Sequence, residues 1–166
     1  MEKTRLNTTM NPLPAGMADL ITPVTIYLKI RDTYPNAILL ESSDYHGNKN
    51  SMSYICFDVL SVFRVEDFTI QITFASGNKE RYAITGKDSI PEIFNSFIRS
   101  FQINVNTENN TTPTNGMFGY TSYDSVRYFD DIKLRTEKKS LYTIPDINYA
   151  VYRYIIGINH FSNRIF

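Results

Sequence analysis

The stretch FTIQITFASGNKERYAIT, residues 68–85, decides the fold class of this chain. Its first seven residues alternate apolar and polar side chains with a period of two, as in a strand with one buried face. Ser76-Gly77-Asn78-Lys79 then supplies the residue types of a tight turn, and the chain returns through a second strand to Thr85. We therefore predict an antiparallel β-hairpin at this position, and with it an antiparallel sheet.

Further strands are predicted on both sides of this hairpin, because short runs there are rich in β-branched, aromatic and other apolar residues. The last two of them are expected to be paired or consecutive. These predicted strands are residues 37–42, 52–58, 60–66, 116–121, 147–152 and 153–161.

Helices are predicted between the strands. Pro23, which follows the cap residue Thr22, begins a helix over residues 23–33. Apolar residues that repeat every three or four positions predict a second helix over 88–101, with a wide stripe for packing on a sheet. A short third helix is expected over 122–131.

The chain is predicted to form a single α+β domain of antiparallel β-sheets packed with a few outer helices. Its 166 residues are enough for one domain with a sizeable core. Residues 1–19 are polar and lack apolar periodicity, which predicts a flexible N-terminal arm before a domain over 20–166. Residues 102–115 are also polar and predict a long loop.

Charge and hydropathy argue against several classes of partner. Lys plus Arg equals Asp plus Glu, 17 each, whereas nucleic acids and anionic membranes attract a basic excess. The chain has no run of about 18 apolar residues for a membrane helix and no apolar core of a signal peptide. Cys56 lies in an apolar run and is expected to be a buried packing residue in a reducing compartment. We therefore predict a cytoplasmic protein without nucleic-acid or membrane partners.

The sequence carries no known catalytic or metal-binding motif. His46 and His160 lie in different segments, and neither has metal-ligand neighbours at helical spacing. A glycine-rich phosphate loop, a His-Glu-x-x-His motif and a nucleophile elbow are all missing from the sequence. The acidic pair Asp130-Asp131 would face different directions on a helix. We expect no catalytic residue, no metal ligand and no cofactor in this chain.

One strand ends in a way that packing does not explain. The apolar run AILL at 37–40 stops at Glu41, which is followed by the hydroxyls of Ser42 and Ser43. A carboxylate beside hydroxyls could hold a small zwitterion, with Glu41 facing its ammonium and hydroxyls or amides facing its carboxylate. The alternative is a solvated boundary residue at the end of a strand.

Four motifs, in order along the chain, resemble the N-terminal segment of the anthranilate synthase component I family. They are ITPV at 21–24, the pattern LLES…SxSY within 39–54, GMFGYTSYDSVR at 116–127, and the strands IPD and INH at 144–146 and 158–160. The resemblance spans residues 20–161. It implies the N-terminal α+β domain of a chorismate-utilising lyase, without the catalytic chorismate-binding domain.

The resemblance implies an activity for the full-length enzyme. That enzyme would convert chorismate and ammonia, derived from glutamine, to anthranilate and pyruvate in tryptophan biosynthesis. Mg²⁺ would act in the missing catalytic domain, and the partners of this chain would be that chorismate-binding domain and a glutamine amidotransferase subunit. The chain alone is not expected to be an enzyme.

The resemblance also implies part of a feedback site for L-tryptophan. Met52 stands where relatives usually carry Lys or Arg, and a thioether cannot pair with a carboxylate. Asn159 replaces the usual Asp of the last strand motif but keeps a polar acceptor. Binding by this chain alone is expected to be weak or absent, because half of the pocket belongs to the missing domain. The residues assigned to the site are Pro23, Leu40, Glu41, Ser42, Met52 and Ser53.

The GMFGYTSYDSVR motif also has a structural interpretation. Gly119 and Tyr120 would mark a strand that is packed tightly against a helix. Tyr123, Val126 and the pair Tyr128-Phe129 are expected to supply core side chains. The motif would then support the ligand site and the contact with the catalytic domain.

Two alternatives to this function remain open. Aminodeoxychorismate synthase component I, which makes a folate precursor, has the same N-terminal architecture, and the residues that separate the two enzymes lie outside this chain. The other alternative is a free-standing small-molecule-binding domain without catalysis.

Overall fold

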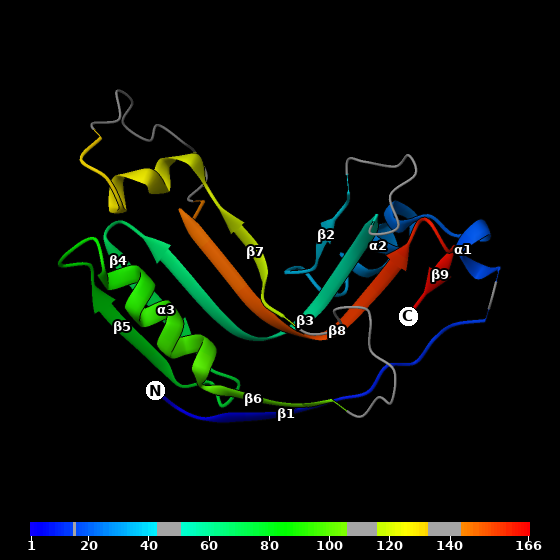
Figure 1. The fold of residues 1–166 in the computed structure, drawn as a ribbon, viewed down its shortest axis with the longest axis horizontal. Helices are drawn as coiled ribbons and strands as arrows, with labels where there is room; N and C mark the ends of the chain where they lie inside the picture. The colour runs from blue at the N-terminus through cyan, green and yellow to red at the C-terminus, as the bar shows by residue number, and fades with distance from the viewer. Residues whose placement is uncertain (15, 43–50, 106–115, 133–143) are drawn as a thin grey trace. The chain divides into compact units, whose positions relative to one another are not determined.

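The computed structural model describes residues 1–14, 16–42, 51–105, 116–132 and 144–166 (Figure 1). These residues belong to two compact units. Unit 1 consists of Met1–Leu6, Leu60–Ile103 and Met117–Val151. Unit 2 consists of Asn7–Val59, Asn104–Gly116 and Tyr152–Phe166.

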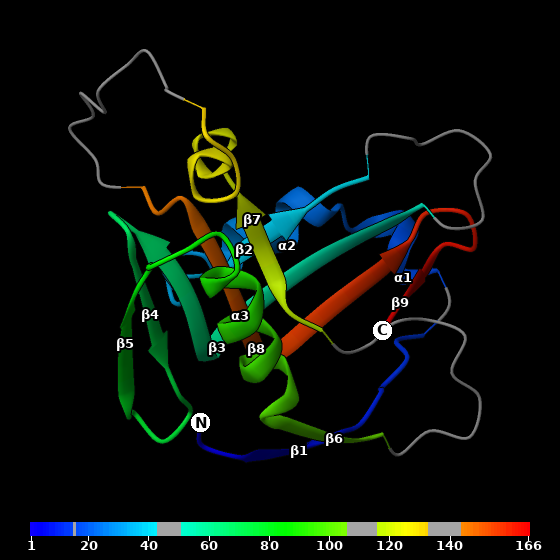
Figure 2. The same ribbon diagram turned by 60° about the vertical axis from the view of Figure 1, so that its left-hand side comes forward.

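The predicted α+β class is confirmed (Figures 1 and 2). The large sheet is antiparallel, as predicted, whereas a second, small sheet is parallel. A seven-stranded sheet has the order β5-β4-β3-β8-β7, with β2 paired to β3 and β9 paired to β8, and β1 pairs with β6 in a second sheet. In chain order the elements are β1 (Thr4–Thr8), α1 (Met17–Leu20), α2 (Pro23–Ile30), β2 (Ile38–Leu40), β3 (Met52–Glu66), β4 (Thr69–Thr73), β5 (Lys79–Ala83), α3 (Ser89–Arg99), β6 (Phe101–Val105), β7 (Phe118–Thr121), the 3₁₀-helix η1 (Tyr123–Tyr128), β8 (Ile147–Asn159) and β9 (Arg164–Ile165).

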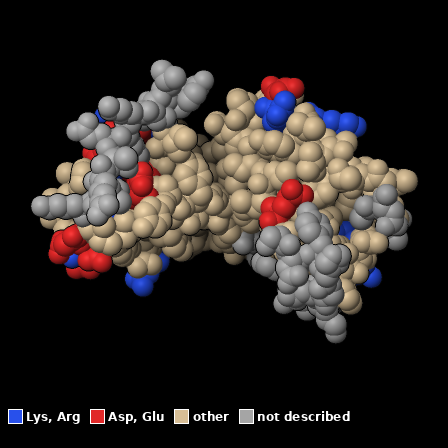
Figure 3. All heavy atoms as spheres, turned by 90° about the horizontal axis from the view of Figure 1, so that it is seen from above, with Lys and Arg blue, Asp and Glu red and all other residues tan. Residues whose placement is uncertain are grey.

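The helices and the charges have simple distributions. Within the described part of the chain, no helix combines the length and the apolar character that a membrane span requires. On the face shown in Figure 3, acidic and basic side chains occur in small separate groups, and most of the atoms belong to uncharged residues.

The predicted hairpin is confirmed in unit 1. β4 and β5 pair antiparallel, with Thr69 opposite Ala83 and Thr73 opposite Lys79. Burial alternates along β4, as the period of two in the sequence predicts. Gly77 in the turn has a φ of +89°, a conformation that glycine adopts without steric cost.

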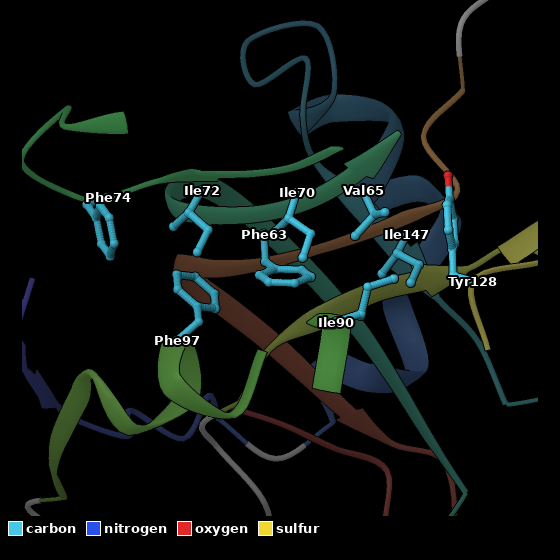
Figure 4. Packing of buried hydrophobic residues seen from close by; sticks show 9 residues of the cluster. All are labelled: Phe63, Val65, Ile70, Ile72, Phe74, Ile90, Phe97, Tyr128 and Ile147. Atoms are coloured by element: carbon cyan, nitrogen blue, oxygen red, sulfur yellow. The ribbon is translucent and has the colours of Figure 1, made fainter. Parts of the chain in front are cut away.

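The core of unit 1 lies between α3 and the strands β3, β4 and β8 (Figure 4). The ring centroid of Phe63 on β3 lies 4.8 Å from that of Phe94 and 5.8 Å from that of Phe97, both on α3. The predicted apolar stripe of this helix therefore packs on the sheet, as expected. The other buried members of the cluster are Val65, Ile70, Ile72, Phe74, Ile90, Tyr128 and Ile147.

Residues 52–58 and 60–66, predicted as two strands, form the single strand β3. Asp58, near the middle of β3, has a φ of +60°, which bends the backbone locally without ending the strand. Its carboxylate pairs with Nε of Arg153 on β8 at 2.7 Å. The two predicted strands over 147–161 are likewise consecutive parts of one strand, β8.

The predicted helix over 122–131 is shorter and tighter than expected. It is a 3₁₀-helix, in which residues three positions apart share a face, so that Ser125 and Tyr128 are both buried. Tyr123 is 85% exposed and Phe129 is 40% exposed. The prediction that these two side chains belong to the core is therefore wrong.

Unit 2 has its own apolar cluster beneath α2. Thr22 caps this helix by accepting a hydrogen bond from the backbone N–H of Thr25 at 3.1 Å, and Pro23 occupies the first turn, as predicted. The helix ends at Ile30, three residues before the predicted end. The cluster consists of buried Ile55, Ile158 and Ile165, with partly buried Met17, Ile26, Tyr27, Ile30, Leu39, Phe57 and Ile156 packed against them.

Two segments predicted to be irregular contain strands. Thr4–Thr8, within the predicted arm, forms β1, and the first residues of the predicted loop over 102–115 belong to its partner β6. Nδ2 of Asn104 donates to Oδ1 of Asn7 at 3.2 Å. The rest of that loop and His46 lie outside the described residues.

A side chain at Gly119 should destabilise unit 1. A Cβ there would lie 1.9 Å from the carbonyl oxygen of Asn148 and 2.7 Å from Cα of Tyr149, so the close packing is against strand β8 and not against the predicted helix. Because both are backbone atoms of the paired strand, Gly119→Ala should lower the free energy of unfolding by about 1–3 kcal/mol in a denaturant titration. Gly86→Ala is the matched control, since nothing lies within 4 Å of its Cβ. Equal stability of the two variants would contradict this packing.

Alkaline pH should destabilise the fold through two buried acids. Burial raises the pKa of the Cys56 thiol from 9.0 to about 12, and that of the Tyr152 phenol from 10.0 to about 12. The unfolded chain loses the Cys56 proton above pH 9 and the Tyr152 proton above pH 10, whereas the folded chain retains both. The contribution of each group is therefore complete below that pH and is lost as the pH rises toward 12. The free energy of unfolding should fall by about 1.4 kcal/mol per pH unit for each such group. Denaturant titrations between pH 8 and 11 measure the slope, which Cys56→Val should reduce.

Candidate functional site

The six residues that the resemblance assigned to a ligand site all lie in unit 2. β2 and β3 pair antiparallel, with Leu39 opposite Ile55 and Leu40 opposite Tyr54. Continued past β2, this register leads Glu41 toward Ser53, so the end of β2 meets the start of β3. Pro23 begins α2, Leu40 ends β2 and is followed by Glu41 and Ser42, and Met52 and Ser53 begin β3.

The register divides these residues between two faces. Successive side chains of a strand point to opposite sides, and residues two apart share a side. Leu39 and Ile55 belong to the cluster that packs against α2, so Glu41 and Ser53 fall on the same face as α2. The structure therefore groups Glu41 and Ser53 with the helix that Pro23 begins. The residues that fall on the opposite face are Leu40, Ser42 and Met52.

Exposure differs strongly among these side chains. Glu41 is exposed, whereas Ser53 is fully buried. Pro23, Ser42 and Met52 are half-buried. A carboxylate at the surface beside a buried hydroxyl can bind an ammonium group and hydrogen-bond a polar group beneath it. The assignment of these residues to a ligand site stays a prediction.

Ser53 has a partner that the sequence did not reveal. Its Oγ lies 2.7 Å from Nε2 of His160, and the backbone N–H of His160 donates to the carbonyl oxygen of Ser51 at 3.0 Å. His160 directly follows β8, so it connects the end of that strand to the start of β3. The signal in the sequence was the occurrence of both residues in resembling motifs, but only strand pairing shows that they meet.

Asn159, the other departure from the family pattern, makes a turn. Its Oδ1 accepts hydrogen bonds from the backbone N–H groups of Phe161 at 3.0 Å and Ser162 at 2.9 Å, where the chain leaves β8 for β9. A carboxylate oxygen of Asp could accept the same two bonds. The substitution thus preserves the acceptor that the turn requires.

Two other resembling motifs meet in unit 1. Nη2 of Arg127, from GMFGYTSYDSVR, lies 2.5 Å from Oδ2 of Asp146, from IPD. Asp146 is fully buried, and the Tyr128 hydroxyl donates to it at 2.6 Å. Burial, followed by this hydrogen bond, raises the pKa of the Tyr128 phenol. The backbone of Asp146 also bonds to Val65 on β3 at 2.8 Å and to Ser122 at 2.7 Å.

This arrangement joins several elements of unit 1. The guanidinium of Arg127 also lies over the ring of Phe68, 5.4 Å from its centroid. Arg127 and Asp146 thereby connect η1, β3 and the start of β8. Among the residues that the structure describes, no cluster of three or more His, Cys, Asp or Glu could hold a metal ion.

Comparison with known proteins supports the resemblance. The chain is 26% identical over 149 residues to anthranilate synthase component 1 of Thermus thermophilus. This chain is similar to anthranilate synthase component I. It is also 27% identical over 154 residues to anthranilate synthase component 1 of Pseudomonas aeruginosa. In both cases the match covers 90% of this chain, so the predicted resemblance is confirmed over nearly its whole length. No protein-family model matches the chain.

The relatives named anthranilate synthase component 1 are much longer than this chain, which spans about 29% of their length. A crystal structure of anthranilate synthase component I from Streptococcus pneumoniae aligns with 95% of this chain and 31% of that chain, at 16% identity and a TM-score of 0.45.

Asp146→Asn should weaken unit 1 markedly. The variant keeps the shape of the side chain but removes the charge that Arg127 faces in a buried setting. We expect the free energy of unfolding to fall by about 3 kcal/mol, because Arg127 is then partly buried without an opposite charge. Asp131→Asn is the matched control: it breaks the surface pair with Lys87 at 3.0 Å, and because solvent screens an exposed pair the loss of stability should be much smaller. If denaturant titrations gave similar losses for both variants, Asp146 would not have this role.

Proposed function

We propose that this chain is the N-terminal regulatory and structural domain of anthranilate synthase component I and carries part of a feedback site for L-tryptophan. The similarity to two proteins of that name over 90% of the chain supports the enzyme assignment. The ligand-site assignment rests on the register of β2 and β3. This register leads exposed Glu41 toward Ser53, on the face that α2 covers.

In this proposal the chemistry belongs to the rest of the enzyme. The full-length protein converts chorismate and ammonia to anthranilate and pyruvate in the cytoplasm. A chorismate-binding domain supplies the catalytic groups and the Mg²⁺ site, and a glutamine amidotransferase subunit supplies ammonia. This chain contributes no catalytic residue and acts through packing and ligand binding. The names of the relatives favour anthranilate over aminodeoxychorismate as the product.

The groups of unit 2 match the parts of an amino acid. The carboxylate of Glu41 pairs with the ammonium, and the hydroxyl of Ser53 serves the polar end. Pro23 and the apolar residues that follow it on α2 offer a surface to the indole. Relatives usually carry Lys or Arg at the position of Met52. Met52 has no hydrogen-bond donor and falls on the opposite face, so it does not pair with the ligand carboxylate. We therefore expect modest affinity.

Glu41→Ala in the full-length enzyme should relieve inhibition by L-tryptophan. Losing a hydrogen bond between charged groups should raise the inhibitory concentration about tenfold or more. Glu92→Ala is the control, because it removes an exposed glutamate from α3 of unit 1. Anthranilate formation at increasing L-tryptophan concentrations measures the effect, and unchanged inhibition curves for Glu41→Ala would refute the assignment.

A further inference from the structure

A buried hydroxyl without a partner lies next to the Ser53–His160 contact. Ser51 is 3% exposed, and its Oγ has no hydrogen-bond partner among the described residues. A buried polar group that stays unpaired costs free energy, so native proteins rarely retain one without a reason. A bound ligand that accepts a hydrogen bond from Ser51 would supply that reason.

Ser51 points to the same side as the residues already grouped with α2. It directly precedes β3, and side chains two apart on an extended chain share a face. Ser51 and Ser53 therefore fall on the face of Ile55, which belongs to the cluster beneath α2. Glu41 falls on this face as well. One face thus carries a carboxylate, two hydroxyls and an imidazole.

His160 holds both serines in place. Its backbone N–H donates to the carbonyl oxygen of Ser51 at 3.0 Å, and its Nε2 lies 2.7 Å from Oγ of Ser53. When Nε2 carries the ring hydrogen, it donates to Ser53, and the hydroxyl hydrogen of Ser53 is directed elsewhere. The two serines then present two hydroxyl donors on one face, and one of these hydroxyls is oriented by an imidazole.

We propose that Ser51 and Ser53, oriented by His160, bind the carboxylate of the amino-acid ligand, while Glu41 binds its ammonium. This inference rests on the proposed function. A carboxylate accepts several hydrogen bonds, so two hydroxyls on one face suit it, whereas Glu41 would repel it. Ser42 and Met52 fall on the opposite face and cannot complete this set. His160 acts as a positioning residue, and the site selects ligands that carry both charges.

Two probes separate the two halves of the site in the full-length protein. L-Tryptophan carries both charges, and L-tryptophanamide keeps the ammonium but has no carboxylate. Ser51→Ala should weaken binding of L-tryptophan about tenfold and change binding of L-tryptophanamide less than twofold. Glu41→Ala should weaken binding of both. Isothermal titration or the emission of the added indole measures affinity, since this chain contains no Trp.

Stability measurements exclude a merely structural role. Ser51→Ala removes an unpaired buried hydroxyl, so it should leave the thermal midpoint of the ligand-free protein unchanged or raise it. Ser53→Ala should lower that midpoint, because it removes the partner of Nε2 of His160. His160→Gln, which can still donate a hydrogen bond to Ser53, should retain more affinity for L-tryptophan than His160→Phe.

The outcomes distinguish the two proposals. If L-tryptophan does not bind, or if Glu41→Ala binds it as tightly as the wild type, the proposed function fails and this inference fails with it. If Glu41→Ala weakens the binding of both probes but the affinity of Ser51→Ala for L-tryptophan is within twofold of the wild type, only the carboxylate assignment fails. Loss of affinity in Ser51→Ala together with a lower midpoint would also overturn it.

Discussion

Successive side chains of a strand point to opposite faces, and this constraint at the start of β3 decides which side chains of unit 2 the proposed ligand would meet. Ser51, Ser53 and Ile55 fall on the face beneath α2, while Met52 and Tyr54 between them fall on the other. Hydroxyls at the start of the strand are therefore followed, on the same face, by an apolar cluster. A ligand with a polar head and an aromatic body can follow this order along a single strand.

Elements with a clear period could be predicted from the sequence. The hairpin over 68–85 and the stripe of α3 depend on local spacing, and the cap at Thr22 depends on its immediate neighbours. Strand length was harder to predict, because Asp58 bends β3 without ending it. The six residues of η1 are too few to separate a period of 3.0 from one of 3.6, so Tyr123 was placed wrongly in the core.

The candidate site shows the same division between local and non-local information. The resemblance could indicate which residues to examine, such as Glu41 and Ser53. It could not show that Ser53 meets His160, which is 107 positions away, or that Arg127 meets the buried Asp146. Both contacts depend on which strands are neighbours and in what register. Residues of one motif thus depend on contacts with residues of another motif. These contacts come from strand pairing, which the composition does not predict.

Cys56 makes the two units experimentally distinguishable. It is the single cysteine of the chain, it is fully buried in unit 2, and its thiol stays protonated until strongly alkaline pH. Alkylating reagents attack the thiolate, so they reach this sulfur when unit 2 opens. The rate of thiol modification under native conditions therefore reports the opening equilibrium of unit 2 without a signal from unit 1. Cys56 can thus serve as a built-in chemical probe of local opening in unit 2.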